Sequence, residues 1–149
     1  MKILVGISGG VDSTYVAYKL KQMGHTVEGL VLEMHEHTDV TSAERVAEIL
    51  DIKLHKLDCR ELFEKYVISD FISEYSSGHT PNPCTVCNRY VKMAELCRFA
   101  KENGFDKAAT GHYAEIVFEK KHGQICRKKS KGRKKRSELY VVALDSGTA

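Results

Sequence analysis

The sequence predicts an α/β protein built on one parallel, doubly wound sheet. Short apolar runs of strand length alternate with segments whose apolar residues recur at helical spacing. A glycine-rich loop joins the first apolar run to the first helical segment. The chain has 149 residues, enough for a single domain with a core. Strands that alternate with helices through right-handed crossovers form a parallel sheet, so this architecture is expected here.

The first part of the chain contains three expected strands, at residues 3–7, 26–32 and 52–57. A helix follows the first strand, with its apolar positions at helical spacing. A second helix is expected to begin with a capping box. In that motif, the Thr41 hydroxyl accepts a hydrogen bond from the backbone N–H of Glu44, and the Glu44 carboxylate reaches back.

Two longer helices and a fourth strand are expected in the second part. Apolar residues repeat at helical intervals over residues 59–75, and another helix is expected over 88–103. Pro81 and Pro83 predict an extended loop between these helices. Residues 105–110 form a strand of small residues that ends before Gly111.

The net charge of +3 conceals a strong asymmetry, because residues 120–136 contain ten Lys or Arg and no acidic residue. The remainder of the chain is therefore net acidic. Two interpretations of this block stay open, a contact for nucleic-acid phosphates and a solvated loop without a partner. Residues 113–118 and 139–144 are expected to pair as a hairpin with the block at its tip. The expected organisation is a binding domain over 1–118, a basic loop or linker over 119–137 and a short terminal strand over 138–149.

The composition also bears on the cellular compartment. No apolar stretch approaches the ~20 residues that span a bilayer. The chain opens directly on a core strand, so no signal peptide is expected. Five cysteines with one C-x-x-C pair fit a reducing compartment better than a disulfide framework. A cytoplasmic location without membrane contact is expected.

The glycine-rich loop, SGGVDS at residues 8–13, is expected to bind an anion. It lies between a strand and a helix N-terminus, where free N–H groups and the helix dipole favour negative charge. Gly9 and Gly10 allow close backbone approach to a phosphate, and the Ser8 and Ser13 hydroxyls add hydrogen bonds. Asp12 is suited to hold Mg²⁺. The spacing excludes a Walker A motif.

A second motif, Cys84-Thr85-Val86-Cys87, precedes the helix over 88–103. The helix dipole is expected to lower the pKa of a cysteine at this position and to raise its reactivity. The pair supplies only two ligands, whereas a structural zinc or a four-iron cluster needs three or four. The pair is a candidate metal site only if other residues complete it.

These motifs together carry a family resemblance. Residues 8–13 resemble the SGGxDS signature of the PP-loop ATP pyrophosphatases. GHTPNPCTVCNR at 78–89 and ATGHYA at 109–114 are similar to segments of tRNA-specific 2-thiouridylases, in the same order. The resemblance runs from residue 1 to about residue 118. It implies an adenine nucleotide alpha hydrolase-like, Rossmann-like fold.

The resemblance also implies a reaction, in which ATP adenylates the 2-oxygen of a wobble uridine in tRNA and a cysteine persulfide then replaces AMP. Mg²⁺ would offset the phosphate charge. Asp12 and Cys87 take the catalytic positions, with Cys87 as the nucleophile. Asn82, Pro83 and Cys84 would face the tRNA or help to shape the sulfur site. The positions implied for ATP binding are Gly6, Ile7, Ser8, Gly9, Gly10, Val11, Asp12, Ser13, Leu32 and Gly111.

The sequence departs from the family at several points. Cys84 stands where many members have Asp, so an iron–sulfur cluster on Cys84 and Cys87 becomes plausible. Members usually continue well beyond this length, and no residue here matches their second catalytic cysteine. The chain is expected to hold the ATP pyrophosphatase part. Its expected partners are tRNA, a sulfur-donor protein and a second chain that supplies the missing half. Two alternatives remain: a PP-loop enzyme that adenylates another substrate and carries an iron–sulfur cluster, and an ATP- or RNA-binding module without turnover.

Overall fold

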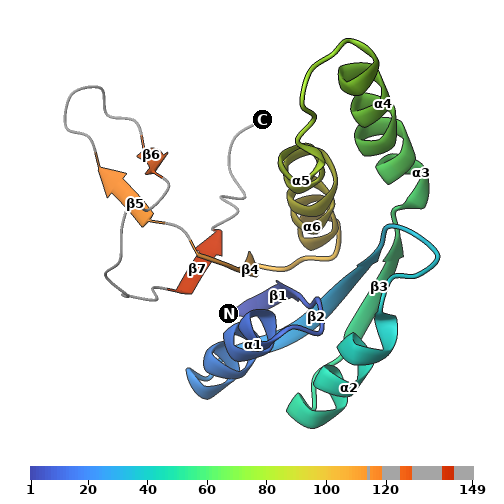
Figure 1. The fold of residues 1–149 in the computed structure, drawn as a ribbon. Coiled ribbons are helices and arrows are strands. Elements are labelled where there is room, and N and C mark those ends of the chain that lie inside the picture. The colour runs from blue at the N-terminus through green and yellow to red at the C-terminus, as the bar shows by residue number, and fades with distance from the viewer. Residues whose placement is uncertain (114, 119–124, 129–138, 143–149) are drawn as a thin grey trace.

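A five-stranded sheet forms the centre of the protein in this computed structural model, which describes residues 1–113, 115–118, 125–128 and 139–142. The strand order is β3-β2-β1-β4-β7 (Figure 1). The first four strands along the chain pair in parallel, and β7 runs antiparallel to β4. Their bounds are β1 Lys2–Gly6, β2 Thr26–Glu33, β3 Leu54–Asp58, β4 Lys107–Tyr113 and β7 Leu139–Val142. The parallel α/β fold expected from the sequence is confirmed.

Helices cover both faces of the sheet. The helices are α1 Val11–Gln22, α2 Val40–Leu50, α3 Arg60–Phe63, α4 Ser69–Ser76, α5 Pro83–Cys87 and α6 Met93–Glu102. In Figure 1, α1 and α2 lie on one side of the sheet, and α5 and α6 lie on the other. β2 and β3 lie on one side of β1, and β4 joins β1 on the other side. The direction in which strands are added to the sheet therefore reverses between β1 and β4. Ligands of such sheets bind at this switch point, outside the carboxyl ends of the strands.

Alternating residues of β1 divide the hydrophobic core into two layers. Ile3 and Val5 pack with buried residues of α1 and α2. Leu4 points to the opposite layer, where it packs with Leu96 and Phe105. Successive strand residues point to opposite faces, so a strand that is buried on both sides reads as a continuous apolar run. This alternation accounts for the unbroken apolar pattern from which the strand was predicted.

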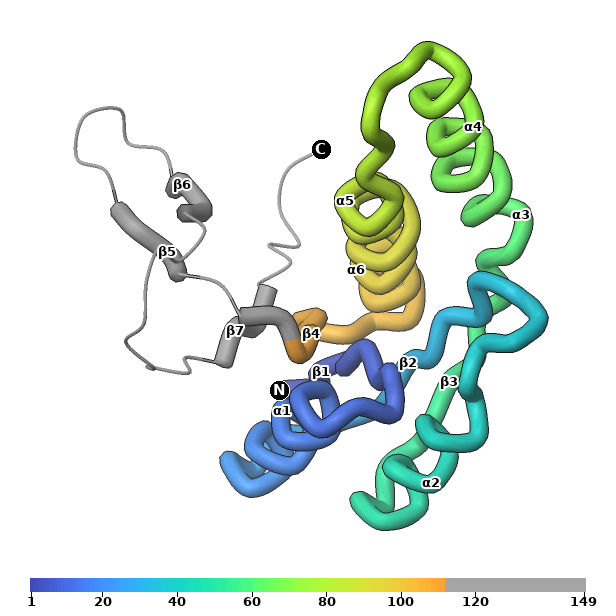
Figure 2. The backbone as a smooth tube through the Cα atoms, in the orientation of Figure 1, coloured from blue at the N-terminus to red at the C-terminus, as the bar shows by residue number. Residues whose placement is uncertain are grey.

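Two wide turns interrupt the helices of the second layer. π-Helical segments η1 (Glu64–Ile68) and η2 (Asn88–Lys92) join α3 to α4 and α5 to α6, and Figure 2 shows the path of the chain through them. The second helical stretch begins at Pro83, five residues before the predicted start at residue 88. Asn82 caps it, because its side-chain oxygen accepts a hydrogen bond from the backbone N–H of Thr85 at 3.2 Å. Proline suits the first turn, where no N–H partner is needed.

The expected capping box at the start of α2 is wrong. The helix begins two residues earlier, and Asp39 is its N-cap. An Asp39 carboxylate oxygen accepts from the backbone N–H of Ser42 at 3.0 Å, and the other accepts from the Ser42 hydroxyl at 2.5 Å. Glu44 is instead bound to Lys56, with 2.5 Å between the Lys56 ammonium nitrogen and a Glu44 carboxylate oxygen. Asp and Thr are both good caps, and the tertiary partner of Glu44 lies outside any local pattern.

The predicted hairpin between residues 113–118 and 139–144 is also wrong, apart from one antiparallel pair, Tyr113 with Leu139. Strand β5 (Glu115–Phe118) pairs with β6 (Ile125–Lys128), and β7 pairs with β4 instead. The segment 119–137, expected to be a basic loop, therefore contains a four-residue strand at 125–128. The rest of that segment and residues 143–149 lie outside the described residues. No helix in the described part of the chain has the length and apolar character that crossing a membrane requires.

Candidate functional site

The glycine loop is held by hydrogen bonds among its own residues. The Ser13 hydroxyl donates to the carbonyl of Gly10 at 3.0 Å and accepts from the backbone N–H of Ser8 at 3.2 Å. The Ser8 hydroxyl lies 3.2 Å from that of Ser13 and accepts from the backbone N–H of Gly10 at 3.4 Å. Ser13 is buried and Ser8 is exposed. The serine pair thus shapes the loop as well as offering hydroxyl groups to a ligand.

Two neighbouring backbones leave no room for side chains beside this loop. A Cβ on Gly9, whose φ is +78°, would lie 2.5 Å from the Cβ of Ser42 in α2. A Cβ on Gly111 would lie 2.7 Å from the backbone nitrogen of Ser13. Glycine alone fits such approaches, because a Cβ would displace the Ser42 side chain at position 9 or the Ser13 backbone at position 111. The loop is therefore enclosed between the start of α2 and the end of β4.

The loop leads directly into α1, which Gly10 begins without any side-chain cap. The chain places Val11 and Asp12 in its exposed first turn, and Val11 is 85% exposed. Uncapped N–H groups at a helix N-terminus, together with the helix dipole, attract an anion. The carboxylate of Asp12 beside that anion has the oxygen chemistry that Mg²⁺ prefers. The glycine cradle and the donors around it thus fit a Mg²⁺-bound polyphosphate.

The remaining residues expected at this site line the ends of β1 and β2. Gly6 ends β1, and the Ile7 backbone N–H donates to the Leu30 carbonyl at 2.8 Å, so pairing with β2 continues past the strand. Leu32, near the end of β2, is half-buried. It packs against the α6 layer and against a second apolar cluster that contains Cys87. Leu32 is thus tied to the cysteine motif, which the sequence pattern did not indicate.

The two cysteines of the C-x-x-C motif have different surroundings. Cys84 is exposed in the first turn of α5, whereas Cys87 is only 6% exposed at its end. Cys87 packs with Cys59 and half-buried Met34, and the Cys87 and Met34 sulfur atoms are 3.6 Å apart. Met34 follows the end of β2, so it brings Cys87 to the carboxyl edge of the sheet, where the glycine loop also lies.

The expected lowering of the cysteine pKa is wrong for Cys87. Burial raises the pKa of the Cys87 thiol, and the nearby charge of Lys92 opposes that shift without overcoming it. Burial, followed by the charge of Glu95, likewise raises the pKa of Cys59 to about 11. A short helix dipole stabilises a thiolate only where the sulfur stays close to water and to the N–H groups, and Cys87 does not. In this conformation Cys87 is a shielded, protonated thiol.

The described residues do not assemble an iron–sulfur site. No group of three or more His, Cys, Asp or Glu side chains that could hold a metal ion occurs among them. Four cysteines, at positions 59, 84, 87 and 97, are free thiols there, and the side chain of Cys126 lies outside the described residues. A cluster needs three or four thiolates, so Cys84 and Cys87 alone do not fit one.

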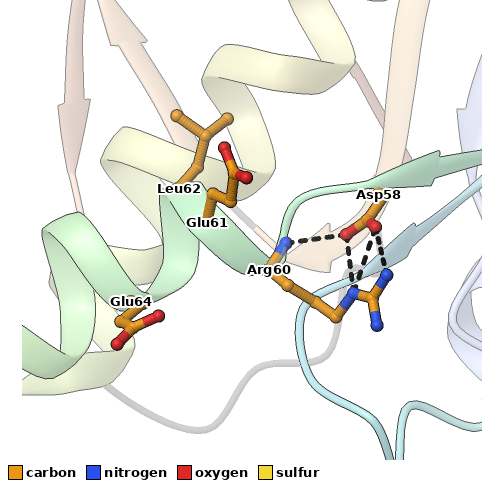
Figure 3. Close-up of a pocket in the computed structure, with 5 residues that line it drawn as sticks. All are labelled: Asp58, Arg60, Glu61, Leu62 and Glu64. Carbon is orange, nitrogen blue, oxygen red and sulfur yellow. Dashed lines mark hydrogen bonds and ion pairs between the residues drawn. The ribbon is translucent and has the colours of Figure 1, made fainter.

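A surface pocket lies away from the glycine loop, beside the edge strand β3. It is lined by Asp58, Arg60, Glu61, Leu62 and Glu64 (Figure 3). Arg60 binds Asp58 through its guanidinium, and its backbone N–H donates to the carboxylate at 3.0 Å. These hydrogen bonds hold the pKa of Asp58 at about 2. Arg60 neutralises Asp58, whereas Glu61 and Glu64 leave the lining acidic. Because β2 also separates β3 from β1, the pocket is not part of the anion site.

The structure brings the predicted loop residues and Gly111 together, and it places the cysteine motif at the same edge of the sheet through Met34. Asn82 serves as a helix cap, and Pro83 occupies the first position of α5. The sequence patterns missed Ser42 and Met34. Only their positions could have indicated them. Met34 directly follows β2 and Ser42 lies in the first turn of α2, so both are at the carboxyl edge of the sheet, where ligands bind.

The glycine loop leads into a helix N-terminus without a side-chain cap, and β4 encloses it at the switch point of a parallel sheet. This arrangement defines a nucleotide-binding α/β protein of the PP-loop type. Comparison with known proteins specifies the group. The chain belongs to the family described as "tRNA methyl transferase HUP domain", whose match covers residues 1–147.

Curated relatives of this chain include tRNA-specific 2-thiouridylases. The protein from Campylobacter lari is 50% identical over 121 residues, which is 78% of this chain and 36% of that protein. The protein from Clostridioides difficile is 40% identical over 154 aligned residues, which is 95% of this chain and 42% of that protein. The chain thus spans about two fifths or less of the length of these relatives.

Solved structures share the fold. A chain described as a predicted subunit of tRNA methyltransferase from Methanocaldococcus jannaschii matches with a TM-score of 0.59 and 26% identity, over 76% of this chain and 53% of that one. An NH3-dependent NAD synthetase from Campylobacter jejuni matches with a TM-score of 0.54 and 15% identity, over 75% of this chain and 47% of that one. The second likeness concerns the fold alone.

Proposed function

We propose that this chain is the ATP-cleaving part of a tRNA thiolation enzyme. The observation that carries the proposal is the enclosed glycine loop between Ser42 and Gly111, at the same sheet edge as Cys87. The 2-thiouridylase relatives support tRNA as the substrate. ATP is expected to bind along Gly6–Ser13, with Leu32 and Gly111 beside it.

The first step is adenylation of the uridine. The 2-oxygen of the base attacks the α-phosphorus of ATP, the bond to the β-phosphate breaks, and pyrophosphate leaves. The N–H groups at the start of α1 would hold the phosphate oxygens, and Asp12 would orient Mg²⁺, which offsets their charge. This step turns the 2-oxygen, a poor leaving group, into part of AMP, which is a good one.

The second step is sulfur transfer by Cys87. A sulfur-donor protein loads Cys87 as a persulfide, whose terminal sulfur attacks carbon 2 of the uridine and displaces AMP. A second thiol then breaks the remaining S–S bond, and the disulfide formed is reduced by an external thiol. The position of Cys87 beside Met34, at the carboxyl edge of the sheet where the glycine loop also lies, supports this role. Asn82, Pro83 and Cys84, at the exposed start of α5, would face the tRNA.

The test is formation of 2-thiouridine in bulk tRNA supplied with ATP, Mg²⁺ and a persulfide donor, measured by mass spectrometry of nucleosides. Cys87→Ser should bind ATP normally and form no 2-thiouridine. Cys97→Ser, a half-buried cysteine of α6, is the matched control and should retain thiolation. Asp12→Ala should lose pyrophosphate release. Normal thiolation by the Cys87 variant would contradict the sulfur assignment. A wild-type chain that releases no pyrophosphate from ATP in the presence of tRNA would contradict the function proposed for it.

A further inference from the structure

Two exposed tyrosines stack on each other beside the cysteine motif. The ring centroids of Tyr66 and Tyr90 are 5.7 Å apart, and their planes are inclined by only 16°. Tyr66 lies in η1 and Tyr90 in η2, so the contact joins the two π-helical turns. The tyrosines are 37% and 45% exposed, which leaves part of each ring open to a ligand. π-Helical turns are rare and occur frequently at functional sites.

Each tyrosine follows a cation that lies over its ring. The Lys65 ammonium nitrogen is 5.3 Å from the centroid of Tyr66, and the guanidinium carbon of Arg89 is 5.2 Å from that of Tyr90. Within the described residues, neither cation pairs with a carboxylate. The described Lys and Arg residues that do pair are Lys2, Lys21, Lys56, Arg60 and Arg98. Lys65 and Arg89 thus keep their charge available to an external anion.

The stack is anchored directly over the cluster that contains Cys87. Val67 and Val91 follow the two tyrosines, are 2% and 0% exposed, and belong to that cluster. The order cation, tyrosine, valine therefore occurs twice, at residues 65–67 and 89–91. In both segments the buried valine fixes the turn while the preceding tyrosine stays at the surface. η1 also contacts α5, which carries the cysteine motif.

We propose that this cation–tyrosine surface, Lys65-Tyr66 with Arg89-Tyr90, contacts unpaired nucleotides of an RNA next to Cys87. Exposed aromatic rings stack bases whatever their sequence, and Lys and Arg neutralise the adjacent phosphates. Lys65 and Arg89 lie over the stacked rings and have no carboxylate partner among the described residues, so their charges are available to a polyanion that stacks there. The inference rests on the proposed function and names where nucleotides near the reacting uridine would lie.

The test is the dissociation constant of the full chain for a synthetic RNA stem–loop with an unpaired loop, compared with an RNA duplex of equal length. Tyr90→Ala should weaken stem–loop binding by roughly 5- to 150-fold, because loss of one stacked base costs about 1–3 kcal/mol. Tyr90→Phe should bind within about twofold of wild type, since the ring is retained. Tyr18→Ala on α1, where the tyrosine is 47% exposed, is the matched control and should leave affinity unchanged.

A second variant removes the charges without touching the rings. Lys65→Gln with Arg89→Gln should weaken stem–loop binding and reduce the slope of log K against log salt by roughly one to two. Wild-type affinity in both Tyr90→Ala and the double variant would overturn the proposal, as would absence of stem–loop binding by the wild-type chain. A changed sedimentation coefficient in place of changed RNA affinity would indicate a contact between copies and overturn it as well. Failure of the proposed function is separate, because it appears as lost cleavage of ATP to AMP with RNA binding intact.

Discussion

Gly111, at the end of β4, lies against Ser13 in the first turn of α1, so closely that a Cβ at position 111 would stand 2.7 Å from the Ser13 backbone nitrogen. This contact fixes β4 to the first turn of α1, which follows β1 and the glycine loop, across the switch point of the sheet. The position of the helix N-terminus, and thus of any bound phosphate, depends on it.

Replacement of Gly111 by alanine should therefore displace the loop. We expect Gly111→Ala to weaken ATP binding by about tenfold or more and to cost about 1–3 kcal/mol of stability, as overpacking does. Isothermal titration calorimetry and thermal unfolding measure the two effects. Gly24→Ala is the control, because Gly24 has a φ of +81° and open space around its Cβ position. It should lower the melting temperature while leaving ATP affinity unchanged, whereas wild-type ATP affinity in Gly111→Ala would contradict the enclosed loop.

The cap of α2 gives a second prediction, because the structure and the local sequence pattern assign it differently. Asp39→Ala should lower the melting temperature by a few degrees, roughly 2–8 °C, since it removes the hydrogen bonds to Ser42. Thr41→Ala should have little effect, because Thr41 is exposed inside the helix and is not its cap. Thermal unfolding followed by circular dichroism distinguishes them. A larger fall in melting temperature for Thr41→Ala than for Asp39→Ala would mean that Thr41, as in the predicted capping box, is the cap.

The cysteines should differ in reactivity. At pH 7.5, iodoacetamide is expected to modify exposed Cys84 at least about tenfold faster than Cys87, whose burial raises its pKa. Cys59, with a pKa of about 11, should react still more slowly, with a rate that rises about tenfold for each pH unit toward that value. Peptide mapping by mass spectrometry measures all three. Equal rates for Cys84 and Cys87 would mean that Cys87 is reached by solvent more readily than the packing allows.

Glu28 should make stability depend on pH. Burial tends to raise its pKa, but hydrogen bonds from His55, at 2.6 Å, and from Lys2 outweigh this and hold the pKa of Glu28 below its ordinary value of 4.5. A carboxyl whose pKa is lowered by folding stabilises the protein above its unfolded pKa, and that contribution is lost as pH falls through the folded value.

Glu28→Gln should therefore cost about 1–2 kcal/mol near pH 6, and the difference from wild type should shrink as pH falls below 4.5. Urea unfolding between pH 3 and pH 7 measures it. Exposed Glu48→Gln is the control and should show no such loss. A difference that stays constant over this range would mean that the charge of Glu28 is not what stabilises the fold.

Local patterns predicted the parts of the site that local chemistry controls. The run from residue 3 to residue 7, with two glycines and two serines after it, is sufficient to place a strand, a tight loop and a helix N-terminus. These features need only a few adjacent residues, and they were predicted correctly. The fourth strand was predicted with other bounds: it was expected over 105–110, before Gly111, whereas β4 runs over Lys107–Tyr113 and includes Gly111.

Features that depend on distant partners were not predictable in this way. Two good capping residues, Asp39 and Thr41, compete at the start of α2, and the packing of the loop against Ser42 favours the earlier one. The low pKa expected for Cys87 assumed solvent contact, whereas Met34 and the surrounding cluster exclude water. The pairing of β7 with β4 depends on the whole sheet, which the spacing of two short apolar runs does not specify.

The identity of the nucleotide product tests the central claim most directly. ATP labelled at the α-phosphate is incubated with the chain, Mg²⁺ and bulk tRNA, and the products are separated by chromatography. The enclosed loop at the start of α1 predicts that the label leaves ATP as an adenylate, bound to tRNA or released as AMP, with an equal amount of pyrophosphate, in a tRNA-dependent reaction that Asp12→Ala abolishes. Labelled ADP with orthophosphate would contradict the account, because it would mean that cleavage falls between the β- and γ-phosphates.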